Sequence, residues 1–460
     1  MQTWELRAEF ALRMSRMYGE EVPAYNTLVE VSTEVNKDYL DRLGHDAERL
    51  GSIDRVTAER HGAIRVGTPE ELSNVARLFA AFGMYPVGFY DLRDAAASSV
   101  PVVSTAFRPR DADELALNPF RVFTSMLTID DPRFFDKELR RELWDFMSQR
   151  ELFGQELLGL ADQAAADGGI EGREAPRLLD LAVESFVLSD SPITESWYRR
   201  LENISAVAAD IGGVDSTHIN HLTPRVLDID ALYQKMEARG ITMIDEIQGP
   251  PRWEGPDILL RQTSFRALSE KRVFEFDDGT VGPGSLKVRF GEVEQRGIAV
   301  TPAGRELYDT MLAEVDKRVA EGGDTSRKPE IALQVWRENL PSTEAGLAQQ
   351  ELGYFTYAVA EETDQAAGLS LEDAVSRGFV ERTPIVYEDF LPKSAAGIFQ
   401  SNLDGDGSRD DTAAAVSFDI HTLSEIVGRQ IIEPTDMYRK QQQDSIDQVT
   451  QRLGLDPGER

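Results

Sequence analysis

Apolar residues recur every three or four positions through residues 3–50, with charged residues between them. This spacing places the apolar side chains on one face of a helix, so residues 1–50 are predicted to form an N-terminal helical segment. From residue 53 to residue 66 the pattern changes to alternation of apolar and polar positions, which indicates a strand. The chain therefore passes from helices into a unit that contains both kinds of element.

The unit at residues 51–110 has clear signals for a helix between strands. Thr68-Pro69-Glu70-Glu71 combines a capping box with proline at the first helical position, and Gly83 supplies a helix end. Apolar runs at residues 84–92 and 100–107 then predict further strands. The order of strand, helix and strands indicates a βαβββ module.

A second stretch repeats the plan of the first. The segment His61-Gly-Ala-Ile-Arg-Val66 is similar to His221-Leu-Thr-Pro-Arg-Val226, which lies 160 residues later. Seven residues after each histidine stands a helix-start residue, which is Asp228 in the second copy. The strand candidates after that helix are residues 241–247, 258–265, 272–276 and 286–300. We assign residues 206–302 to a second βαβββ module.

Helical patterns fill the regions outside the two units. Residues 111–205 are predicted to be a mainly helical insertion, and residues 303–460 a helical C-terminal region. Within the latter, residues 384–402 are unusually apolar and rich in small residues. The predicted fold class is α+β, with paired βαβββ modules that form a half-open barrel and with large helical additions.

The composition limits the partners that this protein can have. With 49 basic and 81 acidic residues, the formal net charge is −32, which disfavours nucleic acid and anionic membranes. The chain has no cysteine, so disulfides and thiolate metal sites are excluded. No apolar run approaches the ~18 residues that span a bilayer, and the N-terminus lacks a secretion signal. We therefore expect a cytoplasmic protein whose metal ligands, if any, are histidine, aspartate or glutamate.

His61 and His221 stand at the same position of the two copies, in a chain with five histidines. Matching positions in paired units predict that the two imidazoles converge on one metal. The alternating stretch 286–294 places Glu292 and Glu294 on one otherwise apolar face, where a metal would compensate the carboxylate charge. Two histidines and one carboxylate suit a non-haem Fe(II) oxygenase, and a zinc site with these ligands is also chemically possible.

Arg65 shares a strand face with His61 across the small residue Ala63. At ~3.3 Å per residue, the arginine lies roughly 13 Å along the strand from the histidine. A metal could then hold one end of a small dicarboxylate while the guanidinium binds the other end with two hydrogen bonds. The pattern predicts a substrate that has two anionic ends.

These residues also have structural interpretations. A single strand histidine is more often a packed or surface residue than a ligand. Glu292 alone could be the buried ion-pair partner of Arg65 or Arg225. His218 has the opposite strand parity from His221, so we expect its side chain to face away from the site.

Five blocks of sequence, from about residue 58 to residue 403, carry a family resemblance. INHLTPRV and RFGEVEQRG resemble the second-half ligand motifs of the vicinal oxygen chelate superfamily, and the 4-hydroxyphenylpyruvate dioxygenases have similar segments. The whole pattern is more similar to the 2-oxoadipate dioxygenase/decarboxylase family. The five blocks are ERHGAIRVGTPEEL, THINHLTPRVLDIDALY, ILLRQTSFRALSE, GEVEQRGIAVTPAGRELYD and YEDFLPKSAAGIFQSN.

The resemblance implies paired modules of vicinal oxygen chelate type around a single Fe(II). The ligands would be His61, His221 and Glu292, with Glu292 preferred to Glu294 because it is the first residue of the E-x-x-Q-R motif. The resemblance also implies that Arg65 holds the distal carboxylate of the substrate.

The same resemblance places residues 384–402 against the substrate. Ser394, in LPKSAAGIF, matches a position next to the substrate, whereas Lys393 replaces an apolar residue of the family's pattern. We expect Ser394 to reach the site and Lys393 to direct its ammonium group to solvent, because a buried unpaired ammonium is costly. The alternative interpretation makes Lys393 a second cationic clamp beside Arg65.

The implied reaction converts 2-oxoadipate and O₂ into 2-hydroxyglutarate and CO₂, a step of lysine breakdown, with Fe(II) as the cofactor. Two alternatives remain open at this point. Another vicinal oxygen chelate metalloenzyme, either a ring-cleaving dioxygenase or a non-redox lyase or isomerase, would have similar ligands. A non-catalytic anion-binding protein would use Arg65 and Arg225 and would need no metal.

Overall fold

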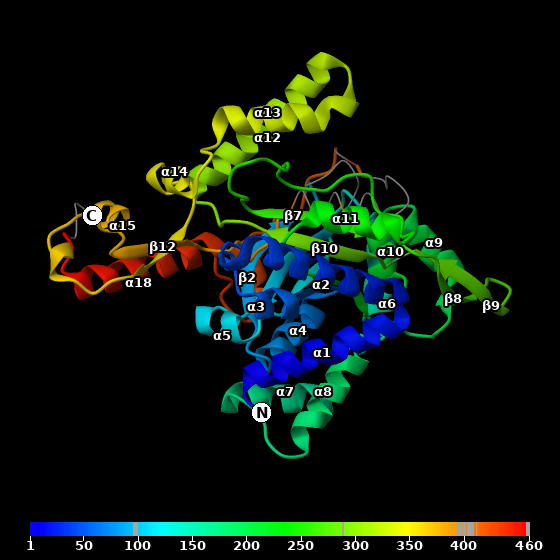
Figure 1. Cartoon of the computed structure of the whole chain (residues 1–460). Coiled ribbons are helices and arrows are strands. Elements are labelled where there is room, and N and C mark those ends of the chain that lie inside the picture. The colour runs from blue at the N-terminus through cyan, green and yellow to red at the C-terminus, as the bar shows by residue number, and fades with distance from the viewer. Residues whose placement is uncertain are drawn as a thin grey trace.

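The computed structural model describes residues 1–94, 100–287, 289–392, 398, 402, 409–410 and 412–456. Two N-terminal helices, α1 (Thr3–Glu21) and α2 (Pro23–Leu43), lie along the central part of the molecule (Figure 1). The predicted apolar stripes of both helices are buried. They include Leu6, Phe10, Met14, Leu28, Val31 and Val35. Residues 53–58, predicted to be part of a strand, instead form the short helix α3 (Ile53–Ala58).

The first βαβββ unit is present and is longer than predicted. Its elements are β1 (Arg60–Val66), α4 (Pro69–Ala80), β2 (Tyr85–Asp91), β3 (Val102–Arg108) and β4 (Arg121–Leu127). The sheet order is β2-β3-β4-β1-β6, with β4 parallel to β1. The predicted helix start is confirmed, since Thr68 Oγ1 accepts from the Glu71 N–H and the Glu71 carboxylate accepts from the Thr68 N–H, both at 3.2 Å.

β4 lies within residues 111–205, which were predicted to be helical, so the first unit does not end at residue 110. All of its residues are buried, and it therefore lacks the alternation that marks a half-exposed strand. A short buried strand and part of a buried helix have the same apolar pattern. The remainder is mainly helical, as predicted: α5 (Ala112–Leu117), α6 (Lys137–Met147), α7 (Gln155–Asp167), α8 (Glu174–Glu184), α9 (Glu195–Glu202) and α10 (Ala206–Gly212), with the short strand β5 (Ile193–Thr194).

The second unit keeps the initial strand and helix, but its other strands are divided between two sheets. Its elements are β6 (Ile219–Pro224), α11 (Ile229–Ala238), β7 (Leu260–Phe265), β8 (Glu270–Glu275), β9 (Val281–Leu286) and β10 (Gly291–Arg296). β7 pairs with β10, whereas β8 and β9 form a hairpin that joins β5. Residues 241–247, predicted to be a strand, make an isolated bridge between Met243 and Phe265 instead.

The two units meet where β1 and β6 pair antiparallel, with Ala63 opposite His221. The register shifts just after this pair and leaves Asn220 as an extra residue, which is a β-bulge in β6. Beyond the end of β6, the Val226 N–H donates to the Glu294 carbonyl at 2.8 Å and brings β10 alongside. Strands from both units therefore lie next to one another.

The C-terminal region is helical but also contains a two-stranded sheet that the sequence analysis did not predict. Its elements are α12 (Pro302–Gly322), α13 (Lys328–Asn339), α14 (Glu344–Gln349), β11 (Phe355–Val359), α15 (Leu371–Ser376), β12 (Val380–Pro384), α17 (Ile420–Val427) and α18 (Pro434–Leu453). β11 pairs with β12 and packs against α18. The α12–α13 pair projects from the rest of the molecule at the top of Figure 1.

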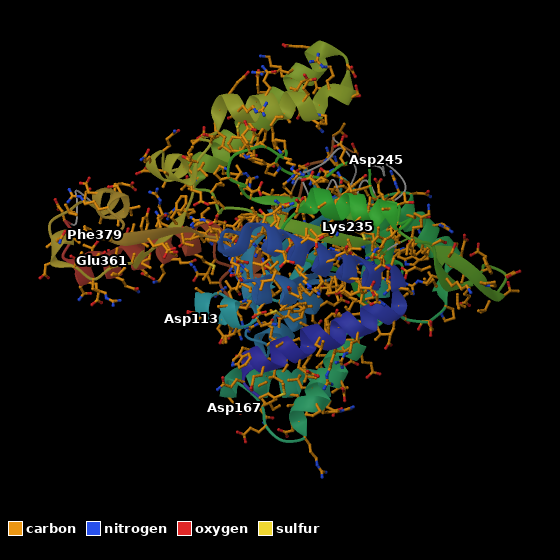
Figure 2. The ribbon with its side chains drawn as sticks, viewed as in Figure 1. Asp113, Asp167, Lys235, Asp245, Glu361 and Phe379 are labelled. Carbon is orange, nitrogen blue, oxygen red and sulfur yellow. The ribbon has the colours of Figure 1, made fainter. Side chains whose placement is uncertain are left out.

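Asp113, Asp167 and Asp245 are exposed acidic residues and are labelled in Figure 2. In the parts of the chain that the structure describes, no helix has the length and apolar character needed to cross a membrane. The predicted α+β class, with two βαβββ units and large helical additions, is confirmed.

Candidate metal centre

Three of the predicted residues come together where β1, β6 and β10 are neighbours. His61, His221 and Glu292 each offer one ligand atom, and these atoms lie within 4.8 Å of one another. His221 Nε2 is 3.3 Å from Glu292 Oε1, and His61 Nε2 is 3.8 Å from Glu292 Oε2. All three residues are buried. The predicted ligand set is thus assembled in space.

The strand register explains this convergence. Ala63 lies opposite His221, so His61, two residues earlier on β1, presents its ring on the same face. The two imidazole rings are 5.3 Å apart between centroids and nearly perpendicular, at 87°. The two histidines of the repeat lie in a single site because the first strands of the two units, β1 and β6, pair with each other.

His218 is not in this ligand group, but the prediction that it faces away from the site residues is wrong. The extra residue Asn220 resets the alternation along β6. His218 Nε2 lies 3.4 Å from Asp210 Oδ1, and Asn220 Nδ2 donates to Asp210 Oδ2 at 3.0 Å. Burial, partly opposed by Asp210, lowers the pKa of His218 to about 4. His218 is therefore neutral at neutral pH.

Arg65 is buried and forms an ion pair with Asp210 of α10. Asp210 was not among the residues predicted from the sequence, although a single acid in the apolar stretch AVAADIG is a signal for it. The alternative role of Glu292 as partner of Arg65 or Arg225 is not what the structure shows. Arg225 pairs with Glu59 at 2.9 Å, and the carboxylate beside Arg65 is that of Asp210.

Each histidine of the group has a polar partner at its other ring nitrogen, an arrangement that is usual for metal-binding histidines. His61 Nδ1 lies 2.9 Å from Glu294 Oε2, although the two atoms are not aligned for a straight hydrogen bond. His221 Nδ1 lies 3.0 Å from Thr223 Oγ1. The Nε2 atoms of both rings are consequently the ones that face Glu292.

Two phenylalanine rings pack against the histidines. Phe390 meets His61 edge to face, with centroids 5.0 Å apart and an interplanar angle of 85°. Phe290 stacks on His221 at 5.7 Å and 23°. Apolar surroundings strengthen the attraction between a carboxylate and a cation, because they lower the local dielectric constant.

The electrostatics of the group suit a cation. Burial, partly opposed by Glu292, lowers the pKa of His221 to about 4, so its imidazole is neutral at neutral pH. Burial also acts to lower the pKa of His61, but Glu294 and Glu292 outweigh it and raise this pKa. The pKa of Glu294 lies well below its usual value, because Arg296 and His61 outweigh the effect of burial. A metal ion would take the place of the proton that His61 attracts.

The donors fit a small divalent metal. Two imidazole nitrogens and a carboxylate within 4.8 Å of one another can reach ligand distances of ~2.0–2.2 Å through small side-chain movements. Across the described ranges, this is the one group of three or more potential ligands with such spacing. Three protein donors leave coordination positions for other molecules.

The predicted pocket residues Lys393 and Ser394 lie outside the described residues. The beginning of the predicted pocket-lining segment, residues 384–402, does reach the site. Phe390 contacts His61, and the Arg296 guanidinium donates to backbone carbonyls of this segment at 2.7 and 3.1 Å.

Buried arginines and carboxylates form a network beside the site that the sequence analysis did not predict. The network joins the first unit to β10 and to the segment after β12. Its ion pairs are Arg55–Glu388, Arg121–Glu59, Arg121–Glu388, Arg225–Glu59, Arg296–Glu294 and Arg108–Asp389.

The fold and the site together define a candidate mononuclear metal centre of two histidines and one glutamate between paired βαβββ units. Sequence comparison then shows the family. The model of a protein family described as 2-oxoadipate dioxygenase/decarboxylase matches residues 10–402 of this chain. The chain is 55% identical over 438 residues to the 2-oxoadipate dioxygenase/decarboxylase of Mycobacterium tuberculosis, with 95% of this chain and 96% of that protein covered. It is 40% identical over 466 residues to the Pseudomonas putida protein of the same name, with 98% and 97% covered.

A solved structure agrees with these relatives. The crystal structure of the hydroxyglutarate synthase from Pseudomonas putida in complex with 2-oxoadipate superposes with a TM-score of 0.84 at 37% identity, covering 99% of both chains. The protein belongs to the 2-oxoadipate dioxygenase/decarboxylase family. The resemblance inferred from the five sequence blocks is confirmed.

Proposed function

We propose that this protein is an Fe(II)-dependent dioxygenase that converts 2-oxoadipate and O₂ into 2-hydroxyglutarate and CO₂ during lysine breakdown in the cytoplasm. The observation that carries the proposal is the buried group of His61, His221 and Glu292, in a chain 55% identical to a 2-oxoadipate dioxygenase/decarboxylase. Two histidines and one carboxylate with open positions are the ligand set of non-haem Fe(II) oxygenases. Iron is therefore preferred to zinc for this site.

The atoms and electrons of this reaction balance without any organic cofactor. The first carbon of 2-oxoadipate leaves as CO₂, the keto carbon becomes a carboxylate, and the adjacent carbon gains a hydroxyl group. Both atoms of O₂ are thereby incorporated, and the substrate supplies the electrons. The metal, when bound, would supply the open positions at which the 2-oxo acid end and O₂ are brought together.

Arg65 is proposed to bind the other end of the substrate. It lies on the same face of β1 as His61, two pleat periods away, with Ala63 between them. Its planar guanidinium matches a carboxylate with two parallel hydrogen bonds. Asp210 pairs with Arg65 and so fixes the position of the guanidinium. The separation between His61 and Arg65 would then select the length of the dicarboxylate.

Residues of the C-terminal segment 384–402, together with Phe290 just before β10, are proposed to complete the pocket. Phe390 and Phe290 pack on the two histidines and would limit the access of water. We propose that Ser394 contacts the substrate through its hydroxyl or backbone and that Lys393 directs its ammonium group to solvent.

The test is oxygen uptake by the Fe(II)-loaded protein with 2-oxoadipate, 2-oxoglutarate and longer 2-oxo dicarboxylates, with the product identified by mass spectrometry. We expect 2-oxoadipate to be the best substrate, with CO₂ and 2-hydroxyglutarate formed in equal amounts and no uptake by His221→Ala. Equal turnover of a 2-oxo acid by the zinc-loaded protein without oxygen uptake would instead indicate a lyase or isomerase. Anion binding without any metal binding would indicate the non-catalytic alternative.

A further inference from the structure

Glu294 faces the same histidine as Glu292 but is not in the ligand group. The two glutamates lie two residues apart on β10 and therefore share a strand face. His61 lies between them, with Nε2 3.8 Å from Glu292 Oε2 and Nδ1 2.9 Å from Glu294 Oε2. The Glu294 side chain is fully buried. The proposed reaction gives this buried carboxylate no part.

The two histidines have unequal partners at Nδ1. His221 Nδ1 lies beside the neutral hydroxyl of Thr223, at 3.0 Å, whereas His61 Nδ1 lies beside a carboxylate. A carboxylate at this position favours the tautomer with the proton on Nδ1 and makes the other nitrogen a stronger donor. A threonine hydroxyl, which carries no charge, has a weaker effect.

Glu294 is held by Arg296 of the same strand, and Arg296 is bound to a part of the chain distant in sequence. Arg296 Nε and Nη2 donate to its two carboxylate oxygens at 2.7 and 2.9 Å. The same guanidinium donates through Nη1 to the carbonyls of Tyr387 and Asp389 at 2.7 and 3.1 Å. The carboxylate therefore cannot rotate away from the imidazole without breaking its two hydrogen bonds to Arg296, which residues 387 and 389 hold in place.

We infer that Glu294 is a positioning residue for the metal, which holds His61 with Nε2 toward the metal and makes it the stronger of the two histidine donors. This inference rests on the proposed metal site of His61, His221 and Glu292. It also implies that the position of residues 387–389 affects the orientation of His61, because Arg296 contacts both these residues and Glu294.

The experiment uses cobalt(II) alone, added to the metal-free protein and followed by equilibrium dialysis and visible absorption. Glu294→Gln keeps the shape of the side chain and removes its charge, and Thr223→Val is the matched change at the other histidine. We expect Glu294→Gln to weaken cobalt binding by about 10- to 100-fold, the range for outer ligand partners, and to shift the visible bands. Thr223→Val should have a smaller effect on both.

A second variant separates positioning from simple charge balance, because Glu294→Gln leaves Arg296 buried without its carboxylate. The double variant Glu294→Gln/Arg296→Gln restores the balance, and it should still bind cobalt as weakly as Glu294→Gln. Nitrogen-15 histidine spectra should also show a loss of the Nδ1-protonated His61 tautomer in both variants.

Recovery of wild-type cobalt affinity and spectrum in the double variant, or no loss in Glu294→Gln, would overturn the inference. Failure of the wild-type protein to bind cobalt would instead reject the proposed metal site itself. The two failures are thus distinguishable by measuring the wild-type protein first.

Discussion

Ala63 on β1 lies directly opposite His221 on β6, and it stands between His61 and Arg65 on one face of the strand. A methyl group therefore occupies the position between the proposed metal ligands and the guanidinium proposed to hold the far end of the substrate. Ala63 is 4% exposed as a residue, so this part of the site is already closely packed. Additional bulk at Ala63 would compete directly with the substrate.

Ala63→Leu is expected to lower kcat/KM for 2-oxoadipate at least tenfold, which corresponds to ~1.4 kcal/mol. Overpacking should also lower the free energy of unfolding by ~1–3 kcal/mol. Ala63→Gly is the control and should keep most of the activity. Steady-state oxygen uptake with metal analysis tests this, and Ala63→Leu with unchanged kcat/KM would show that the substrate does not pass this residue.

Arg65→Ala is expected to cost at least ~2 kcal/mol in kcat/KM for a dicarboxylic 2-oxo acid, because a buried carboxylate would lose its partner. Metal content should stay near the wild-type value. The variant would also leave Asp210 buried without its arginine, so Arg65→Ala/Asp210→Ala is the matched control. Turnover of 2-oxoadipate at the wild-type rate by either variant would remove Arg65 from the mechanism.

The buried His218 should make stability depend on pH. Its pKa is about 4 in the folded protein because of burial, whereas a histidine in the unfolded chain titrates near ~6.5. Between these values the unfolded chain binds a proton that the folded protein does not. The His218 contribution to the free energy of unfolding therefore falls as the pH drops from ~6.5 toward ~4, by up to ~1.4 kcal/mol per pH unit.

Chemical denaturation of the metal-free protein at several pH values in this window tests the sign. His218→Gln should lose the dependence that corresponds to about one proton, relative to the wild-type protein. An identical pH dependence in both proteins would contradict the assignment of a neutral His218.

Lys393→Val is expected to leave the relative rates for 2-oxoadipate and 2-oxoglutarate unchanged, because we propose that the ammonium group of Lys393 faces solvent. Oxygen uptake with both acids measures this ratio. A large change in the preference would support the alternative, in which Lys393 is a second clamp for the distal carboxylate beside Arg65.

The sequence by itself determined the parts of this protein that depend on local pattern. The capping box at Thr68 and Glu71 predicted the start of α4, because both hydrogen bonds form within one turn. The matching positions of His61 and His221, with strand alternation for Glu292, predicted the group of donors that the structure brings within 4.8 Å. Within an unbroken strand, side-chain alternation is a local property, so it can be read without knowledge of the partner strands.

Tertiary structure alone decided the features that depend on pairing between distant segments. The bulge at Asn220 exists only in the register of β6 against β1, and it turned His218 toward Asp210. Likewise, the burial of both faces of β4 removed the alternation that would have marked it as a strand. Glu294 is defined as a partner of His61 by the placement of β10 beside β6. Such contacts join residues far apart along the chain. The local sequence pattern does not specify which strands will pair or in which register, so these contacts could not be predicted from it.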